Sequence, residues 1–138
     1  MMENNIHLNL KSKWFDLILL GEKEQEYREI KAYFIHLFID KTNFKNWGDN
    51  DFIRELEYHK LEILQLKNIK TITFLNGYAK NRRQILVELE KITIGKGKEE
   101  WGAEWNKEYF ILHLGSIISH KNCYYSFFLQ NKNFKFAK

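Results

Sequence analysis

The chain has 138 residues, of which 44% are hydrophobic and 16% aromatic, enough to form one globular domain with its own core. No apolar run approaches the roughly 20 residues of a membrane-spanning helix, and the N-terminus lacks the layout of a secretory signal. A single cysteine, Cys123, excludes an internal disulfide. We therefore expect a cytoplasmic protein, in one domain over residues 1–138, with no membrane partner.

The net charge of +4 comes from the C-terminal end. Residues 121–138 hold four of the 22 basic residues and no acidic one, so residues 1–120 carry 18 residues of each sign. The basic residues of the tail are Lys121, Lys132, Lys135 and Lys138. Overall charge therefore gives no argument for nucleic-acid binding, which would need a local basic patch.

Two short elements are predicted at the start of the chain. Residues 6–10 alternate apolar and polar side chains, which predicts a half-buried strand. Ser12 is the predicted N-cap of a helix that ends at Gly21. The side chains expected on the inner face of this helix are Trp14, Leu17 and Ile18.

Residues 23–28 are predicted to form a second strand. In a regular strand Glu24, Glu26 and Arg28 share one face, so that Glu26 and Arg28 could form an ion pair. Lys23 would lie on the opposite face with Gln25 and Tyr27, or in the turn before the strand, pointing elsewhere.

The next part of the chain is predicted to be helical. Residues 31–39 are mostly apolar, which favours a short buried helix over a strand. A polar loop covers residues 40–50, and Asp49 or Asp51 could cap the following helix. The side chains expected on its inner side are Phe52, Ile53, Leu56 and Ile63.

Strand signals dominate the second half. Residues 71–74 lead to the turn dipeptide Asn76-Gly77. Residues 84–94 alternate as a long strand with Glu88 and Glu90 on one side, and a polar loop separates it from a strand at residues 109–114. The mixture predicts an α+β fold: a partly closed β-barrel of about five to six strands, flanked by two to three helices.

The aromatic tail allows two interpretations. Residues 124–129 could form a strand that completes the barrel or its edge, leaving Lys132, Lys135 and Lys138 in water. Alternatively, the segment is exposed and pairs with a partner protein or with a second copy.

The spacing G-x-K-x-x-E-x-R, from Gly21 to Arg28, resembles the signature of the ASCH family, small β-barrel domains related to PUA RNA-binding domains. Residues 8–18, 27–31, 76–79, 95–103 and 114–115 look like a branch of that family found in phage and bacterial genomes. The resemblance covers about residues 6–118 in the expected order. Residues 119–138 form an extension without a counterpart, and the prolines usual in that branch are missing.

The resemblance implies a cleft that binds RNA or a nucleotide. Lys23, Glu26 and Arg28 would form its floor, and the loop at residues 95–105 would border it. Lys23 and Arg28 would contact phosphate or a base edge, and Glu26 would orient them. Further contacts are expected from Asn76, Lys96 and Trp101, although an aromatic residue in such a loop more often packs on the barrel rim.

An enzyme is the alternative that the resemblance leaves open. Some members of the wider family hydrolyse an acetylated cytidine with a lysine, a threonine three residues later and a glutamate from a strand. Lys23 matches the lysine, but Glu26 stands where the threonine is expected, and Glu88 is a candidate for the strand carboxylate. Other members are ribonucleases. The five histidines have no ligand spacing, so we expect neither a metal nor another cofactor.

Overall fold

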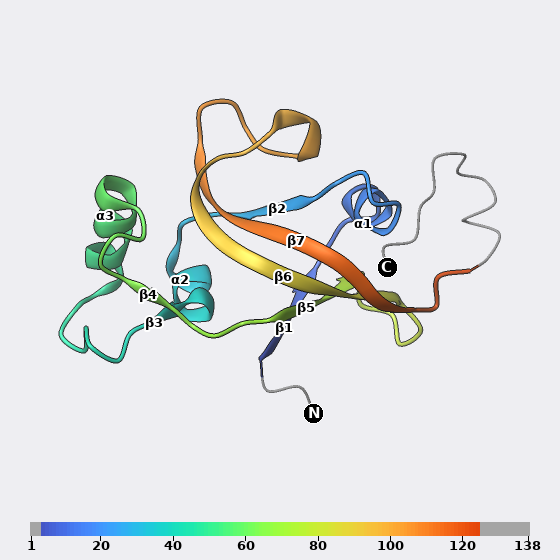
Figure 1. Cartoon of the computed structure of the whole chain (residues 1–138), viewed down its shortest axis with the longest axis horizontal. Helices are drawn as coiled ribbons and strands as arrows, with labels where there is room; N and C mark the ends of the chain where they lie inside the picture. Colours follow the sequence, from blue (N-terminus) through green and yellow to red (C-terminus); the bar gives the residue numbers. More distant parts are fainter. Residues whose placement is uncertain (1–3, 125–138) are drawn as a thin grey trace. The chain divides into compact units, whose positions relative to one another are not determined.

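The computed structural model describes residues 4–124. Over this range the protein is α+β, with three α-helices, a curled sheet of five strands and a second sheet of two (Figure 1). The predicted α+β class, a small barrel-like sheet with flanking helices, is confirmed. The strand predicted at residues 124–129 lies beyond the described range except for Tyr124, as do Lys132, Lys135 and Lys138. None of the helices in residues 4–124 has the length and apolar character needed to cross a membrane.

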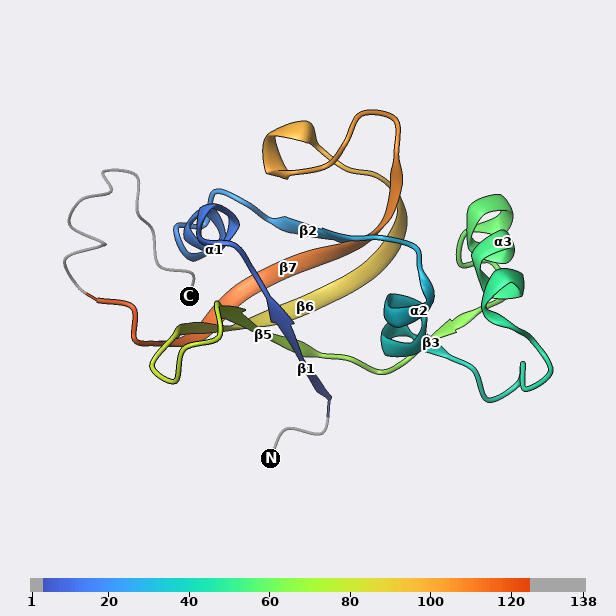
Figure 2. The same ribbon diagram turned by 180° about the vertical axis from the view of Figure 1, so that it is seen from behind.

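The larger sheet has the strand order β1-β5-β6-β7-β2. Its strands are β1 (Asn5–Asn9), β5 (Thr71–Asn76), β6 (Arg83–Lys96), β7 (Glu108–Lys121) and β2 (Gln25–Arg28). β1 runs parallel to β5, beside which it lies in Figure 2, and β5 is antiparallel to β6. β2 is antiparallel to β7 and places Glu26 opposite Leu112. The smaller sheet pairs β3 (Ile39–Asp40) with β4 (Gln65–Leu66).

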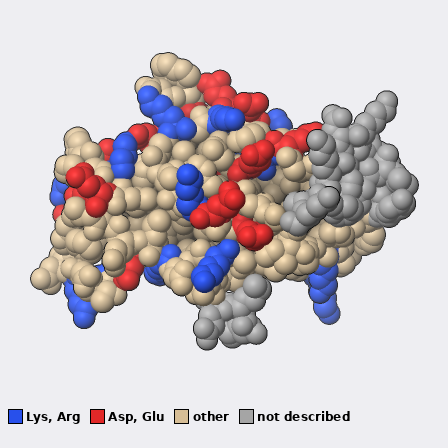
Figure 3. Space-filling model, viewed as in Figure 1, with Lys and Arg blue, Asp and Glu red and all other residues tan. Residues whose placement is uncertain are grey.

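The described chain divides into two compact units. The first comprises residues 4–24, 69–90 and 114–124, and the second comprises residues 25–68 and 91–113. β6 and β7 each contribute to both units. On the face drawn in Figure 3, acidic and basic side chains are interspersed, in keeping with the balanced charge of residues 1–120.

Helix α1 (Ser12–Leu19) of the first unit presents a different face from the one predicted. Its buried side chains are Phe15, Ile18 and Leu19, whereas Trp14 and Leu17 are half-buried. The predicted set of inner side chains and the observed set both have helical spacing, and both include Ile18, so periodicity alone does not distinguish between them. Ser12 is not the N-cap either, because the cap position is Lys11. The helix does end as expected: Gly21 has a φ of 78°, which a glycine adopts without steric cost.

The strands of the first unit follow the predicted alternation. Ile85 and Val87 of β6 are buried, and Glu88 and Glu90 are exposed. β5 is longer than the predicted residues 71–74. The predicted turn dipeptide Asn76-Gly77 ends β5 and opens a loop at residues 77–82. The largest fully buried side chains of this unit are Phe15, Leu19, Ile72, Phe74 and Ile85.

The second unit confirms the helix predicted at residues 31–39, as α2 (Ala32–Phe38). Helix α3 (Asp49–His59) has Gly48 at its N-cap, so neither aspartate occupies the cap position. Instead, Asp51 Oδ2 accepts a hydrogen bond from the Gly48 N–H at 2.7 Å. Ile63 was expected on the inner side but is 54% exposed, because the helix ends at His59.

The loop between β6 and β7 is shorter than predicted. β6 extends to Lys96, and β7 runs from Glu108 to Lys121. A short 3-10 helix (Glu99–Trp101) lies between the two strands. The fully buried core residues of the second unit are Ile35, Phe38, Ile39, Phe52, Leu56, Phe110 and Leu112.

Candidate functional site

Lys23 lies in the segment between α1 and β2, in keeping with the turn alternative. The chain reverses there because Gly21 donates its N–H to the Ile18 carbonyl at 3.0 Å. The backbone N–H groups of Glu22 and Lys23 then both bond the Leu17 carbonyl, at 2.9 and 3.1 Å. These bonds fix the backbone that carries Lys23, whose side chain is only 2% exposed. A lysine this buried is unusual, because desolvation of an ammonium group is costly.

A cavity of about 180 Å³ in the first unit includes Lys23 in its wall. The remaining lining residues are Ile18, Gly21, Glu24, Val87, Leu114, Gly115 and Ile117. The wall is therefore mainly apolar, with one buried cation and one carboxylate. The volume is below the roughly 300 Å³ at which ligand pockets for whole small molecules begin. It therefore suits part of a ligand, such as a phosphate group or the edge of a ring.

Trp14 supports the ammonium group of Lys23. The Lys23 Nζ lies 4.6 Å from the centroid of the Trp14 ring, and the Nζ of Lys13 lies 4.7 Å from the same centroid. A desolvated cation–π contact is worth about 2 kcal/mol, which offsets part of the cost of burying Lys23. Trp14, predicted as a core side chain of α1, is half-buried and contacts the Lys23 ammonium group instead.

Glu88 lies close to one wall of this cavity but on the other face of its strand. A Cβ placed on Gly115 would approach the Glu88 Cβ to 3.1 Å and the Glu90 Cγ to 3.2 Å. Successive side chains of a strand alternate between faces. Glu88 therefore points away from the face on which Val87 lines the cavity, and its side chain is exposed.

Glu26 and Arg28 form the ion pair that the strand spacing predicts. Glu26 Oε2 lies 3.0 Å from Arg28 Nε and 2.7 Å from Nη2, and the two side chains are 8% and 17% exposed. The Arg28 Cζ also lies 5.6 Å from the centroid of the Phe34 ring. Glu26 thus orients the guanidinium. The pair belongs to the second unit and Lys23 to the first, so a site common to all three residues stays a prediction.

The loop after β6 is fastened to two tyrosines of the second unit. The Tyr27 hydroxyl accepts a hydrogen bond from the Lys98 N–H at 2.9 Å and donates one to Gln25 Oε1 at 2.7 Å. The Tyr109 hydroxyl accepts one from the Glu104 N–H at 2.9 Å. Burial raises the pKa of the Tyr27 phenol, and the bond from Lys98 partly opposes that shift.

Trp101 packs against the cluster of Tyr27, Ala103, Tyr109 and Ile111. Lys98 Nζ lies 4.3 Å from the centroid of its ring. The structure thus shows the packing alternative for Trp101. Trp105 is the strongly exposed aromatic of the same loop, at 80%, and Lys96 is exposed at the end of β6.

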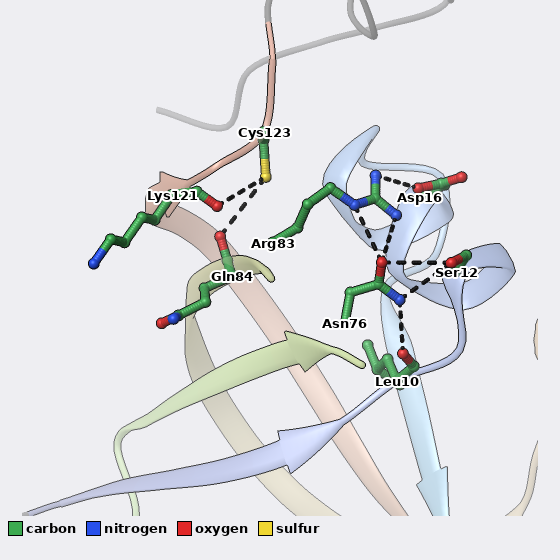
Figure 4. A network of polar contacts seen from close by, with 8 residues as sticks. All are labelled: Leu10, Ser12, Asp16, Asn76, Arg83, Gln84, Lys121 and Cys123. Carbon is green, nitrogen blue, oxygen red and sulfur yellow. Dashed lines mark hydrogen bonds and ion pairs between the residues drawn. The ribbon is translucent and has the colours of Figure 1, made fainter. Parts of the chain in front are cut away.

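Asn76 lies at the centre of a network that joins β5, β6 and α1 in the first unit (Figure 4). Its Nδ2 donates to the Leu10 carbonyl at 3.0 Å and to Ser12 Oγ at 3.2 Å. Its Oδ1 accepts from Arg83 Nε at 3.2 Å and Nη2 at 3.0 Å. The amide of Asn76, a predicted ligand contact, is therefore used within the protein.

Arg83 completes this network on the side of α1. Its Nη1 lies 2.7 Å from Asp16 Oδ1, close enough for an ion pair. This oxygen is buried, and the contact does not have the geometry of a hydrogen bond. Its Cζ lies 4.5 Å from the centroid of the Phe15 ring. Neither Arg83 nor Asp16 is among the predicted site residues, because the two are far apart in sequence and only the fold brings them together.

Comparison of the chain with known protein families, with curated proteins and with solved structures finds no match. The resemblance to the ASCH family, and what it implies about ligands, therefore stays a prediction from the motif.

Proposed function

We propose that the protein binds RNA or a nucleotide, with the Lys23 cavity receiving a phosphate group or a base edge. One observation carries the proposal: the Lys23 side chain is 98% buried yet lines a cavity. Most lysines keep their ammonium group in water by extending the flexible stem, so a buried ammonium group at a cavity wall is an uncommon arrangement. A lysine kept at a cavity wall favours ligands with negative charge or hydrogen-bond acceptors, because charge-assisted hydrogen bonds are the stronger ones.

The remaining features of the cavity support a nucleotide over a simple anion. Its apolar wall of Ile18, Val87 and Leu114 would cover a ring or sugar. The G-x-K-x-x-E-x-R motif, whose lysine is Lys23, supports the same ligand class through the resemblance to ASCH domains. The resemblance also assigns a ligand contact to Arg28, whose guanidinium is oriented by Glu26 in the second unit.

The surroundings of the two candidate carboxylates, Glu26 and Glu88, favour binding without turnover over hydrolysis. The Glu26 carboxylate accepts hydrogen bonding from Arg28, which suits an orienting role better than that of a general base. Glu88 is exposed on the face of β6 opposite Val87. Glu88 is therefore not placed on the cavity face of β6 for the role of proton acceptor that the hydrolase alternative assigns to it.

The test replaces Lys23 by methionine, which keeps the length of the stem and removes the charge. Binding of a fluorescein-labelled single-stranded RNA and of labelled nucleotides is measured by fluorescence anisotropy. Loss of a charged hydrogen bond of about 1.5–3 kcal/mol predicts affinity weaker by roughly 10- to 150-fold.

Lys70→Met is the matched control, because Lys70 is exposed and belongs to the same unit. Circular dichroism checks that each variant is folded. Equal affinity of the wild type, Lys23→Met and Lys70→Met for every probe would reject the cavity as the site. Cleavage of the RNA or release of a modified base during the assay would favour the hydrolase.

A further inference from the structure

Hydrogen bonds join the segment before α1 to the start of the loop at residues 77–82, both in the first unit. The Asn9 side chain donates to the Gly77 carbonyl at 2.9 Å and accepts from the Gly77 N–H at 3.3 Å. One residue further on, the Leu10 carbonyl accepts from Asn76 Nδ2 at 3.0 Å. These bonds hold together two segments that are more than 60 residues apart in sequence.

The two joined segments carry positive charge and almost no negative charge. Lys11, Lys13 and Lys80 are exposed, and Arg82 is half-buried. Neither residues 9–15 nor residues 77–83 contain an aspartate or a glutamate. We call Lys11, Lys13, Tyr78, Lys80 and Arg82 the basic surface. It is a local patch in a part of the chain whose total charge is balanced, and such a patch is the electrostatic footprint expected of a nucleic-acid site.

Tyr78 adds an aromatic ring to the basic surface. The side chain is 86% exposed and follows Gly77, whose positive φ of 85° turns the chain outward from β5. Exposure of a large apolar ring among cations has no benefit for folding. An exposed ring next to cations is, however, the combination by which proteins hold single strands, since bases stack on the ring while lysines follow the phosphates.

Trp14 connects the basic surface to the Lys23 cavity. The Nζ atoms of Lys13 and Lys23 lie 4.7 and 4.6 Å from the centroid of the same ring. Lys13 belongs to the exposed surface, and Lys23 to the wall of the cavity. A ligand held by Lys23 is therefore one aromatic ring away from the first cation of the surface.

We infer that the ligand is a single strand of nucleic acid whose backbone runs from the Lys23 cavity across the basic surface. The inference rests on the proposed function and extends it. One nucleotide enters the cavity, the following phosphates contact Lys13, Lys11 and Lys80, and a following base stacks on Tyr78. The cavity volume of about 180 Å³ agrees with this, since it holds part of one nucleotide and leaves the rest of a strand outside.

The experiment compares a mononucleotide with a single-stranded RNA of about ten nucleotides at several salt concentrations, by fluorescence anisotropy. The wild type should bind the strand more tightly than the mononucleotide. Each phosphate contact adds about 0.7 to the slope of log affinity against log salt for a single strand. The double variant Lys11→Gln/Lys80→Gln should therefore lower the slope by about 1.4 for the RNA and leave mononucleotide binding unchanged.

Tyr78→Ala should weaken strand binding by between about 5-fold and 150-fold, the range for loss of one stacked base. Lys121→Gln and Tyr58→Ala are the matched controls. Lys121 is exposed and points away from Arg83 and α1 in Figure 4, and Tyr58 is 77% exposed on α3. Neither control should change the affinity or the slope.

The outcomes separate this inference from the function on which it rests. Absence of binding to both probes would reject the proposed function. Binding of both probes with equal affinity, unchanged by the Lys11, Lys80 and Tyr78 variants, would reject the strand path alone. Binding of the wild type to anionic lipid vesicles through these residues, without preference for RNA, would overturn the inference in favour of a membrane surface.

Discussion

Gly97 is the position at which the smallest change should have the largest effect on the loop after β6. A Cβ at Gly97 would lie 2.6 Å from two ring atoms of Tyr27 and 2.7 Å from the Cβ of Ala103. Real Cβ atoms do not approach other atoms so closely, so the loop or the tyrosine must move. Gly97 is not one of the glycines with a positive φ, so alanine can adopt its backbone conformation. The expected effect of Gly97→Ala therefore comes from the added methyl group alone.

The size of the effect follows from how firmly Tyr27 is held. Its hydroxyl bonds the Lys98 N–H and Gln25, and its ring centroid lies 5.7 Å from that of Tyr109. Extra methyl groups in a packed core typically cost about 1–3 kcal/mol, and with the ring held this firmly we expect the upper part of that range. For a chain of this length 1 kcal/mol corresponds to about 3 °C, so a loss of about 2–3 kcal/mol should lower the Tm by roughly 6–9 °C.

Gly95→Ala provides the matched control for this prediction. Its Cβ would meet only Ile111 Cδ1, at an ordinary contact distance of 3.5 Å. Removal of the flexibility of a strand glycine should leave stability unchanged or raise it by up to about 1 kcal/mol. Urea and thermal unfolding, followed by circular dichroism, measure both variants. The same unfolding midpoint for Gly97→Ala and Gly95→Ala would show that Tyr27 does not fix the loop.

Two further predictions concern polar side chains that the fold uses. Asn76→Ala should cost about 2–3 kcal/mol in urea unfolding, because it removes the donor to the Leu10 carbonyl and the acceptor of two Arg83 hydrogen bonds. Nucleotide affinity of the folded variant should stay unchanged; a selective loss of affinity at full stability would restore Asn76 as a ligand contact. Tyr27→Phe should cost about 1–2 kcal/mol at pH 8. Because burial raises the pKa of Tyr27, the folded state keeps the phenol proton longer than the unfolded state does, so the advantage of the wild type is complete below pH 10 and declines as the pH rises through the raised pKa. A difference between wild type and Tyr27→Phe that stays constant from pH 8 to pH 11 would contradict this.

Local periodicity was sufficient for the fold class and for the Glu26–Arg28 pair. The alternation at residues 84–94 predicted the exposed side of β6 because side chains of a strand alternate whatever the strand pairs with. The same rule placed Glu26 and Arg28 on one face, two residues apart, where their side chains meet at 2.7 Å. The apolar run at residues 31–39 also identified α2, since a short run without strict alternation packs well as a helix.

The tertiary structure decided everything that depends on which segments become neighbours. The inner face of α1, the use of the Asn76 amide by Arg83 and the burial of Lys23 follow from packing between distant segments. The basic surface is the clearest case. The charges of residues 1–120 sum to zero, but the parallel pairing of β1 with β5 brings the segment that carries Lys11 and Lys13 beside the start of the loop that carries Lys80 and Arg82. Periodicity describes the neighbours within one element, whereas charge at a surface is summed over segments that only the topology joins.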